Sequence, residues 1–178
     1  MPNPKRLFVL RHAKSSWDDP GIDDHERPLA PRGRRAVKVL HQHLCEQHIA
    51  LELVLCSSSR RTRETLEGVE PGGETSIESE LYAASAKDLI ERLRRVPEPT
   101  SSVMVIGHNP AMQLLVLRLT ANAGRVPEGS DLAAIQQKFP TGALATLTFD
   151  CAWSELSSGR AELTAYVRPK AIARQLSK

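Results

Sequence analysis

The chain has 178 residues, of which 40% are hydrophobic and 25% are charged, and its formal net charge at pH 7 is +3. These proportions are those of an ordinary globular protein, so they exclude intrinsic disorder, collagen-like repeats and a coiled coil. A chain of this length buries roughly 70% of the surface that it exposes when unfolded, which is enough for one substantial core. We therefore expect a single domain over residues 1–178.

Cysteine usage and hydropathy predict a cytoplasmic protein without a membrane partner. The three cysteines are odd in number and far apart, and they form no Cys-x-x-Cys pair, which favours a reducing compartment. The apolar stretch before Arg11 is too short for a secretory signal. The longest uncharged run, residues 99–117, contains two prolines, a glycine, a histidine and an asparagine, and is therefore typical of a strand, a loop and a helix.

The charges and aromatic residues argue against a nucleic-acid partner. The excess of positive charge is small and lies in the first third of the chain, and there are only two tryptophans, two tyrosines and three phenylalanines. Such a chain lacks both the basic face and the aromatic platform of a nucleic-acid binder. An anionic ligand bound near the N-terminal third agrees better with this distribution.

Short apolar runs alternate with helical patterns along the chain. Strands are predicted at residues 6–10, 51–56, 103–106, 143–149 and 163–167. One helix follows Pro31, Ser85 and Asp88 form a capping box at the start of another, and Asn109 is the predicted N-cap of a third that runs to Leu119. Loops are predicted at residues 69–75, 97–102 and 124–131.

This alternation predicts an α/β fold in which helices cover both faces of a mostly parallel sheet, forming a three-layer α/β/α sandwich. The last two predicted strands are separated only by residues 150–162, a spacing that suits a long hairpin. One edge of the sheet is therefore expected to be antiparallel.

Polar segments follow the first three predicted strands. They are Arg11-His12, Ser57 to Arg61, and Gly107-His108-Asn109-Pro110. In open α/β sheets ligands bind beyond the carboxyl ends of the strands, so these segments should share one crevice. Two histidines, at least two arginines and a helix N-terminus together suit a phosphoryl group. A single histidine or a Ser-Arg-rich helix start is more often structural, but their convergence has no simple structural explanation.

The same segments carry a resemblance to a family. Leu10-Arg11-His12-Ala13-Lys14-Ser15 resembles the Arg-His-Gly signature of the histidine phosphatase superfamily, which has the phosphoglycerate mutase-like fold, and Ala13 in place of glycine resembles its SixA-like phosphohistidine phosphatase branch. Further similar segments span roughly residues 6–168: Glu26 to Leu29 with Arg32-Gly33, Ser57 to Thr65, Glu80 to Tyr82, Gly107 to Pro110, and Phe139 to Ala143. The motif at Ser57 places the phosphate-binding arginine at Arg61 rather than Arg60, although Thr62 departs from the usual alanine.

The resemblance implies roles for four residues. His12 would attack phosphorus and form a phosphohistidine intermediate that water hydrolyses. Arg11, Arg61 and His108 would hold the phosphoryl oxygens as charge spreads over them. The nearby arginines should also lower the pKa of His12 and keep its attacking nitrogen neutral.

Two roles stay open for Arg27 and two for Glu80. Arg27 either contacts the phosphate or substrate or forms a structural ion pair with a nearby carboxylate (Asp23, Asp24 or Glu26). Asn109 stands where acid phosphatases of this fold have an aspartate, which leaves Glu80 as the one weak candidate for a general acid; its alternative is a solvated surface residue. A phosphoramidate leaving group needs a positioned acid less than an alkoxide does, which favours phosphohistidine as the substrate.

No cofactor is expected. His41, Cys45 and His48 form a stripe on one predicted helix, but without a fourth ligand they fit partly buried helix surface better than a metal site. The aspartates of residues 18–24 lack EF-hand spacing and more simply solvate a loop, residues 14–26, that would form a rim or lid over the phosphate. There is also no nucleotide-binding motif.

The sequence therefore predicts a metal-independent phosphatase whose partner is a phosphorylated substrate, most simply a phosphohistidine protein, with neither nucleic acid nor membrane as a partner. Two alternatives stay open: a phosphatase of small phosphorylated metabolites or phosphoserine proteins that has the same site, and a non-catalytic module that binds phosphorylated ligands. The presence of both the histidines and the arginines argues against the second, because a pure binder needs no nucleophile.

Overall fold

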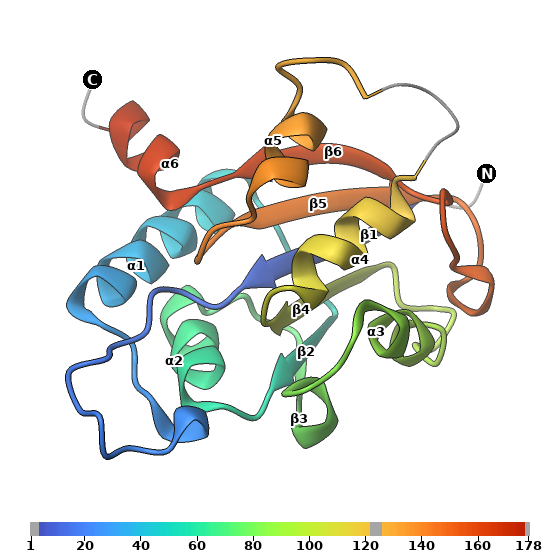
Figure 1. The fold of residues 1–178 in the computed structure, drawn as a ribbon. Coiled ribbons are helices and arrows are strands. Elements are labelled where there is room, and N and C mark those ends of the chain that lie inside the picture. The colour runs from blue at the N-terminus through green and yellow to red at the C-terminus, as the bar shows by residue number, and fades with distance from the viewer. Residues whose placement is uncertain (1–3, 122–125, 177–178) are drawn as a thin grey trace.

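A computed structural model describes residues 4–121 and 126–176, and within them the chain forms a six-stranded sheet (Figure 1). The strands lie in the order β3-β2-β4-β1-β5-β6. Their bounds are Lys5–Arg11 for β1, Leu53–Ser57 for β2, Glu74–Glu78 for β3, Ser102–Gly107 for β4, Leu144–Phe149 for β5 and Glu162–Val167 for β6.

The sheet is mostly parallel. The pairs β1–β4, β2–β4 and β2–β3 are parallel, whereas β5 is antiparallel to both β1 and β6. The segment between β5 and β6 is the predicted long hairpin, and it includes a short 3-10 turn, η3 (Trp153–Glu155). The predicted fold class and its antiparallel edge are both confirmed.

Helices cover both faces of this sheet (Figure 1). On one face lie α1, α2 and α6, and on the other lie α3, α4 and α5. Their bounds are Pro31–Glu46 for α1, Arg60–Val69 for α2, Ala86–Leu93 for α3, Ala111–Leu119 for α4, Asp131–Gln137 for α5 and Pro169–Leu176 for α6. Two more 3-10 turns, η1 (Asp24–Glu26) and η2 (Ser79–Leu81), lie in the connections.

The apolar run of β1 follows from burial on both faces. Leu7 and Val9 pack into the core beneath α3 and α4, whereas Phe8 and Leu10 pack into the core beneath α1 and α2. Successive side chains of a strand point to opposite faces, so a central strand of a three-layer fold must be apolar at every position. The runs that predict β2 and β4 have the same cause.

The start of α1 lies directly against the loop that follows β1. Gly33, in the first turn of α1, is buried, and a Cβ atom at that position would overlap the carbonyl oxygen of Lys14. The amide N–H of Ala30, which precedes the helix, donates to the same carbonyl at 2.8 Å. The helix is therefore held against the segment that carries the Arg-His motif.

Helix boundaries differ from expectation in one place that matters for the site. The predicted capping box of Ser85 and Asp88 is confirmed at the start of α3. The prediction that Asn109 caps α4 is wrong: Pro110 is the N-cap, and the Asn109 amide nitrogen instead donates to the carbonyl oxygen of Phe139 at 2.9 Å. That hydrogen bond joins the start of α4 to the segment before β5.

Strand β3 and helices α5 and α6 were not expected from the sequence. Strand β3 begins inside the loop predicted at residues 69–75. The loop predicted at residues 124–131 falls partly outside the described residues and ends where α5 begins at Asp131. In the part of the chain that the structure describes, no helix is both long and apolar enough to span a bilayer.

Candidate active site

The two histidines of the motifs meet at the carboxyl ends of β1 and β4. Arg11 pairs with Gly107 in the parallel register of these strands, so the residues that follow them leave the sheet side by side. The backbone N–H of His12 donates to the carbonyl oxygen of Gly107 at 3.0 Å, and the ring centroids of His12 and His108 are 5.2 Å apart. Their proximity is thus a direct consequence of strand pairing.

His12 is buried and oriented by its own neighbour. Its Nδ1 lies 2.7 Å from the carbonyl oxygen of Ala13, and because a carbonyl can only accept, Nδ1 carries the proton and Nε2 keeps its lone pair. Burial lowers the pKa of His12 to about 3; the hydrogen bond to Ala13 opposes this shift, and the charges of His108, Arg61 and Arg11 add to it. The ring is therefore neutral at physiological pH, with Nε2 available as a nucleophile.

The loop after β1 is clamped to its surroundings. The amide N–H of Ala13 donates to Oγ1 of Thr65 at 3.0 Å, and the Thr65 hydroxyl in turn donates to the carbonyl oxygen of Arg61 at 2.6 Å. The amide N–H of Gly142 lies 3.1 Å from the carbonyl oxygens of both Arg11 and His12. These contacts fix His12 relative to the first turn of α2.

Two arginines bring unpaired donors to this place. Arg11 Nη1 donates to the carbonyl oxygen of Phe139 at 2.9 Å, and Arg61 Nη1 donates to that of Asp24 at 2.6 Å. Within the described residues, however, the buried Nε–H groups of Arg11 and Arg61 have no hydrogen-bond partner. Burial is the main cause that lowers the pKa of Arg11, and the nearby positive charge of Arg61 is the second cause. Buried cationic donors without acceptors favour binding of an anion.

The neighbouring arginine of the motif points elsewhere. Arg60 Nε donates to Glu64 one turn along α2 at 2.7 Å, and its side chain is 45% exposed, whereas that of Arg61 is 7% exposed. Arg61, and not Arg60, therefore lies among the histidines.

His108 is held between α2 and β2. Arg61 Nη2 lies 3.5 Å from His108 Nδ1, which must accept, so His108 Nε2 carries the proton and donates to Ser57 Oγ at 2.9 Å. Burial lowers the pKa of His108 to about 4, with Arg61 as the next cause and the carboxylate of Asp24 opposing it. His108 is therefore also neutral before any anion binds.

Sequence reasoning named Asp24 only as one possible partner of Arg27 and missed its place at the centre of this network. Asp24, in η1, accepts hydrogen bonds from the hydroxyl of Tyr82 at 2.6 Å, from Arg61 Nη2 at 3.0 Å and from Arg27 Nε at 3.0 Å. The pKa of Asp24 is lowered to about 2. The hydrogen bond from Tyr82 is the largest cause, and Arg61 and Arg27 add to it. The carboxylate is therefore ionised throughout the physiological range.

Arg27 forms the ion pair that was one of its two predicted roles, with Asp24 as its partner. Its Nη1 also donates to Ser15 Oγ at 3.0 Å and to the Ser16 carbonyl oxygen at 3.1 Å, and its guanidinium carbon lies 3.5 Å from the ring centroid of Trp17. Arg27 is buried, whereas the Trp17 side chain above it is 68% exposed. The loop of residues 14–26 thus adjoins the site and presents an aromatic surface to solvent.

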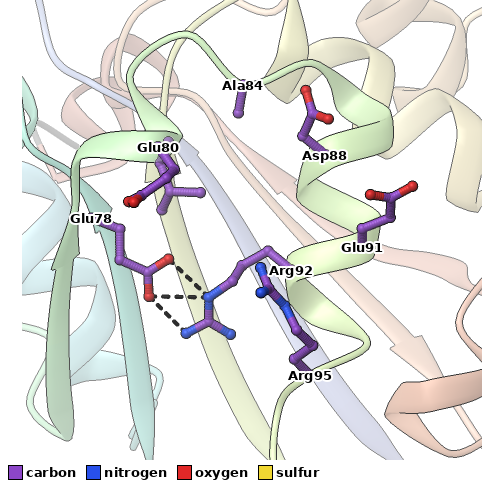
Figure 2. Close-up of a pocket in the computed structure, with 8 residues that line it drawn as sticks. Glu78, Glu80, Ala84, Asp88, Glu91, Arg92 and Arg95 are labelled. Atoms are coloured by element: carbon purple, nitrogen blue, oxygen red, sulfur yellow. Dashed lines mark hydrogen bonds and ion pairs between the residues drawn. The ribbon is translucent and has the colours of Figure 1, made fainter.

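Glu80 lies apart from this network. It is exposed and lines a cavity with Glu78, Arg92 and Arg95, in which Glu78 and Arg92 form a bidentate ion pair (Figure 2). None of the residues that line this cavity belongs to the histidine and arginine network. Tyr82, two residues further on, is the part of this segment that reaches the site.

Of the histidine and cysteine stripe predicted for one helix, His41 and Cys45 lie on the surface of α1, whereas His48 lies beyond the end of the helix at Glu46. His41 Nδ1 lies 3.0 Å from the carbonyl oxygen of Val69, and its Nε2 lies 3.7 Å from Cys45 Sγ. Across residues 4–121 and 126–176 no cluster of three or more histidine, cysteine or acidic side chains could hold a metal ion.

Comparisons with known proteins agree with this geometry. The sequence model described as "Histidine phosphatase superfamily (branch 1)" matches residues 7–82. An uncharacterized protein of Mycobacterium tuberculosis, Rv1276c, is 34% identical over 90% of this chain and all of its own length. The phosphohistidine phosphatase SixA of Escherichia coli is 27% identical over 82% of this chain and 86% of its own.

Solved structures give the same relationship. The protein named SixA from Nakamurella multipartitia superposes with a TM-score of 0.83 at 29% identity, covering 94% of this chain and 97% of that one. A protein histidine phosphatase SixA complexed with tungstate gives a TM-score of 0.74 at 25% identity, covering 94% and 99%. Phosphatase activity is the property that these relatives support. The chain belongs to the histidine phosphatase superfamily, and its structural neighbours include phosphohistidine phosphatases named SixA.

Proposed function

We propose that this protein removes the phosphoryl group from phosphorylated histidine in a protein substrate, through a covalent intermediate on His12. The observation that carries the proposal is the surroundings of His12. A neutral nucleophilic nitrogen lies beside two buried guanidinium groups with unpaired Nε–H donors, and Asp24, the carboxylate that is hydrogen-bonded to Arg61, is ionised.

In the first step Nε2 of His12 attacks phosphorus, and the bond between phosphorus and the substrate nitrogen breaks. The electron pair of that bond stays on the departing ring, which leaves as neutral imidazole because its other nitrogen already carries a proton. The His12 ring gains positive charge as its bond to phosphorus forms, and the Ala13 carbonyl that accepts from Nδ1 stabilises this charge. Arg11 and Arg61 stabilise the phosphoryl oxygens in the transition state.

His108 completes the binding site for the phosphoryl group. The positive charge of Arg61 is one of the causes that keep its pKa low, and a bound dianion opposes that charge. Substrate binding therefore favours a protonated His108 that can donate from Nδ1 to a phosphoryl oxygen.

In the second step water attacks the phosphorus of the intermediate. The bond from phosphorus to His12 Nε2 breaks, its electron pair returns to the ring, and inorganic phosphate leaves with the oxygen of the water and its protons. Free His12 with a proton on Nδ1 is regenerated.

The carboxylates near the site support phosphohistidine over phosphate esters. Asp24 is ionised and cannot donate a proton, Glu80 lines a different cavity, and Asn109 supplies only an amide. An alkoxide leaving group would have to depart without a proton, whereas the imidazole of phosphohistidine leaves as a neutral ring. The substrate class proposed here rests on this difference.

A leaving-group series tests the proposal. We expect kcat/KM for a phosphohistidine peptide to exceed that for the matching phosphoserine peptide by about 10²–10⁴-fold, the usual contribution of a general acid. An activated aryl phosphate should also react faster than the phosphoserine peptide. Equal rates for the three substrates, with chemistry shown to be rate-limiting, would contradict the proposed substrate class and favour a general phosphatase of metabolites or phosphoserine proteins.

Two conservative variants identify a hidden acid if there is one. We expect Asp24→Asn and Glu80→Gln each to change the rates with phosphohistidine and phosphoserine peptides by the same factor, because neither carboxylate donates a proton. A loss confined to phosphoserine in either variant would show that the altered residue is a general acid.

A cytoplasmic location is part of this proposal. Cys45, Cys56 and Cys151 are all free cysteines in the folded chain, which fits a reducing compartment.

A further inference from the structure

A strongly basic cavity lies between the first turns of α1, the segment before β5, and α6. Its volume is about 700 Å³. Among the described residues that line it there are seven cations and no carboxylate, and the cations are Lys14, Arg32, Arg35, Lys138, Arg168, Lys170 and Arg174. We call this the basic cavity.

The cations of the basic cavity lack the partners that other arginines of the chain have. Arg60 pairs with Glu64 and Arg92 pairs with Glu78, whereas no cation of the basic cavity forms an ion pair with a carboxylate of residues 4–121 or 126–176. The net charge of the whole chain is only +3, so its general composition does not account for this concentration. Like charges gathered in one place repel each other, and a bound polyanion would relieve this repulsion.

Strand register places the basic cavity at the same edge of the sheet as the candidate active site. Leu10 pairs with Leu144, and Leu144 pairs with Val167, so the segments before β5 and after β6 lie beside the end of β1 (Figure 1). The two sites share backbone as well: Lys14 is two residues from His12, and Phe139, next to Lys138, accepts the hydrogen bond of the Arg11 guanidinium. A protein with its phosphoryl group at His12 would therefore extend over the basic cavity.

The lining favours a peptide over a small phosphate ligand. The basic cavity also exposes the apolar side chains of Ala36, Val39, Pro140 and Pro169 between its cations. The cations come from four separate segments of the chain. A single phosphate group cannot contact all four segments at once. A peptide that carries several carboxylates can pair with cations spread in this way while its aliphatic carbons cover the apolar surface.

We propose that the basic cavity binds an acidic segment of the phosphoprotein substrate next to the phosphorylated histidine. This inference rests on the proposed function, because it specifies which protein substrates that site accepts. It predicts selection through binding, so it should affect KM and the dependence on salt rather than the chemistry at His12.

The test compares two phosphohistidine peptides that differ only in their flanks, glutamates in one and glutamines in the other. We expect the wild-type protein to hydrolyse the glutamate peptide with kcat/KM roughly tenfold higher, through a lower KM, at low ionic strength, and to lose this preference as salt screens the charges. The variant Arg35→Glu/Lys170→Glu should lose the preference, while its kcat for an aryl phosphate stays unchanged. An unphosphorylated glutamate peptide should bind to the wild type and not to this variant in a fluorescence anisotropy titration.

A matched control variant carries the same change of charge at the opposite ends of the strands, away from the basic cavity. Arg118 and Arg160 are exposed and lie at the end of α4 and in the β5–β6 hairpin. The variant Arg118→Glu/Arg160→Glu should keep the preference for glutamate flanks. Equal kcat/KM for the two peptides in the wild type, or equal losses in the two variants, would overturn the inference.

Other outcomes of the test distinguish failure of this inference from failure of the proposed function. If neither peptide nor the aryl phosphate is hydrolysed, the proposed function fails and the inference fails with it. If both peptides are hydrolysed equally, the function stands and only the inference fails. If tripolyphosphate binds to the basic cavity and the glutamate peptide does not, the cavity is a site for a small phosphate compound, which also overturns the inference.

Discussion

His12 is prepared for its proposed role by its burial and by three neighbours, of which Arg11 and Ala13 adjoin it in sequence and Arg61 comes from α2. The Ala13 carbonyl fixes the proton on Nδ1, the buried position disfavours a second proton, and Arg11 and Arg61 add positive charge nearby. Burial and the arginines lower the pKa of His12; the Ala13 hydrogen bond raises it but keeps the one ring proton on Nδ1, so Nε2 retains its lone pair. The site therefore needs no separate base to deprotonate its nucleophile.

This arrangement predicts the titration of both site histidines. The pKa of His12 is lowered to about 3 and that of His108 to about 4, in each case chiefly by burial. Nitrogen-15 NMR of the ring nitrogens should therefore show neutral rings for both residues from pH 8 down to about pH 5, with His12 protonated on Nδ1 and His108 on Nε2. A His12 pKa near 6.5 in the ligand-free protein would contradict this account of the nucleophile.

The two consecutive arginines of α2 should differ in their effect on turnover. Arg61→Ala removes a buried donor of the proposed phosphate site, so we expect kcat/KM for an aryl phosphate to fall by about 10²–10³-fold. Arg60→Ala removes only an exposed ion pair with Glu64, and its effect should stay within about threefold. Equal losses, or a larger loss for Arg60→Ala, would show that the wrong arginine has been assigned.

At the residue scale, sequence motifs indicate His12, His108, Arg11 and Arg61, but they do not indicate Asp24. Asp24 is one of several acidic residues in residues 18–26, and nothing local distinguishes it. Two of its three side-chain hydrogen bonds come from Arg61 in α2 and Tyr82 after η2, which are 37 and 58 residues away in sequence, and the third comes from Arg27. Only the folded chain brings these groups together.

Helix α1 supports the site through close backbone contact with the loop after β1. A methyl group at Gly33 would overlap the carbonyl oxygen of Lys14, and neither backbone can move away easily because Ala30 is hydrogen-bonded to the same carbonyl. We expect Gly33→Ala to lower the free energy of unfolding by about 1–3 kcal/mol and to reduce turnover by displacing the loop.

Gly21→Ala is the matched control, because a Cβ atom at Gly21 would meet only the Asp19 carboxylate at 3.5 Å. Its free energy of unfolding should lie within about 0.5 kcal/mol of the wild type in chemical denaturation. If Gly33→Ala is as stable and as active as Gly21→Ala, α1 does not constrain the loop.

At the element scale, the central strands and the edge strand β6 could be predicted from the sequence, whereas the other edge strand, β3, could not. Strands β1, β2 and β4 are apolar at successive positions because both faces are buried, which gives a clear signal. Strand β3 is an exposed edge strand with the sequence Glu-Thr-Ser-Ile-Glu, so no apolar run marks it. The start of α4 was misplaced because Asn109 donates across the site to Phe139 instead of capping the helix.

For the whole molecule, the buried neutral histidines predict an acid-sensitive fold. Burial lowers the pKa of His12, His108 and His43 in the folded chain, so the unfolded chain, with ordinary histidine pKa values near 6.5, binds more protons below that pH. Their contribution to stability is therefore complete above about pH 6.5 and declines as pH falls.

Denaturant unfolding should show this directly. We expect the free energy of unfolding to fall between about pH 6.5 and pH 4.5, above the range in which Asp24 takes up a proton, and His12→Asn should show a shallower fall. The same slope in the variant and the wild type would contradict the burial of a neutral His12.

For the whole molecule, the architecture could be predicted from the sequence, whereas contacts between distant segments could not. Alternation of apolar runs with helical periodicity was enough for the three-layer fold and its antiparallel edge. The basic cavity could not be foreseen, because its cations come from the loop after β1, from α1, from the segment before β5 and from α6. In sequence these are scattered lysines and arginines, and folding alone collects them.

His12 is proposed to carry the phosphoryl group during turnover. The most direct measurement is to quench the wild-type protein during turnover of an aryl phosphate and locate the modification by mass spectrometry. We predict phosphate on His12 that is stable in base and labile in acid, and neither label nor turnover in a folded His12→Ala variant. Phosphate on another residue, or substantial turnover by folded His12→Ala, would contradict the account.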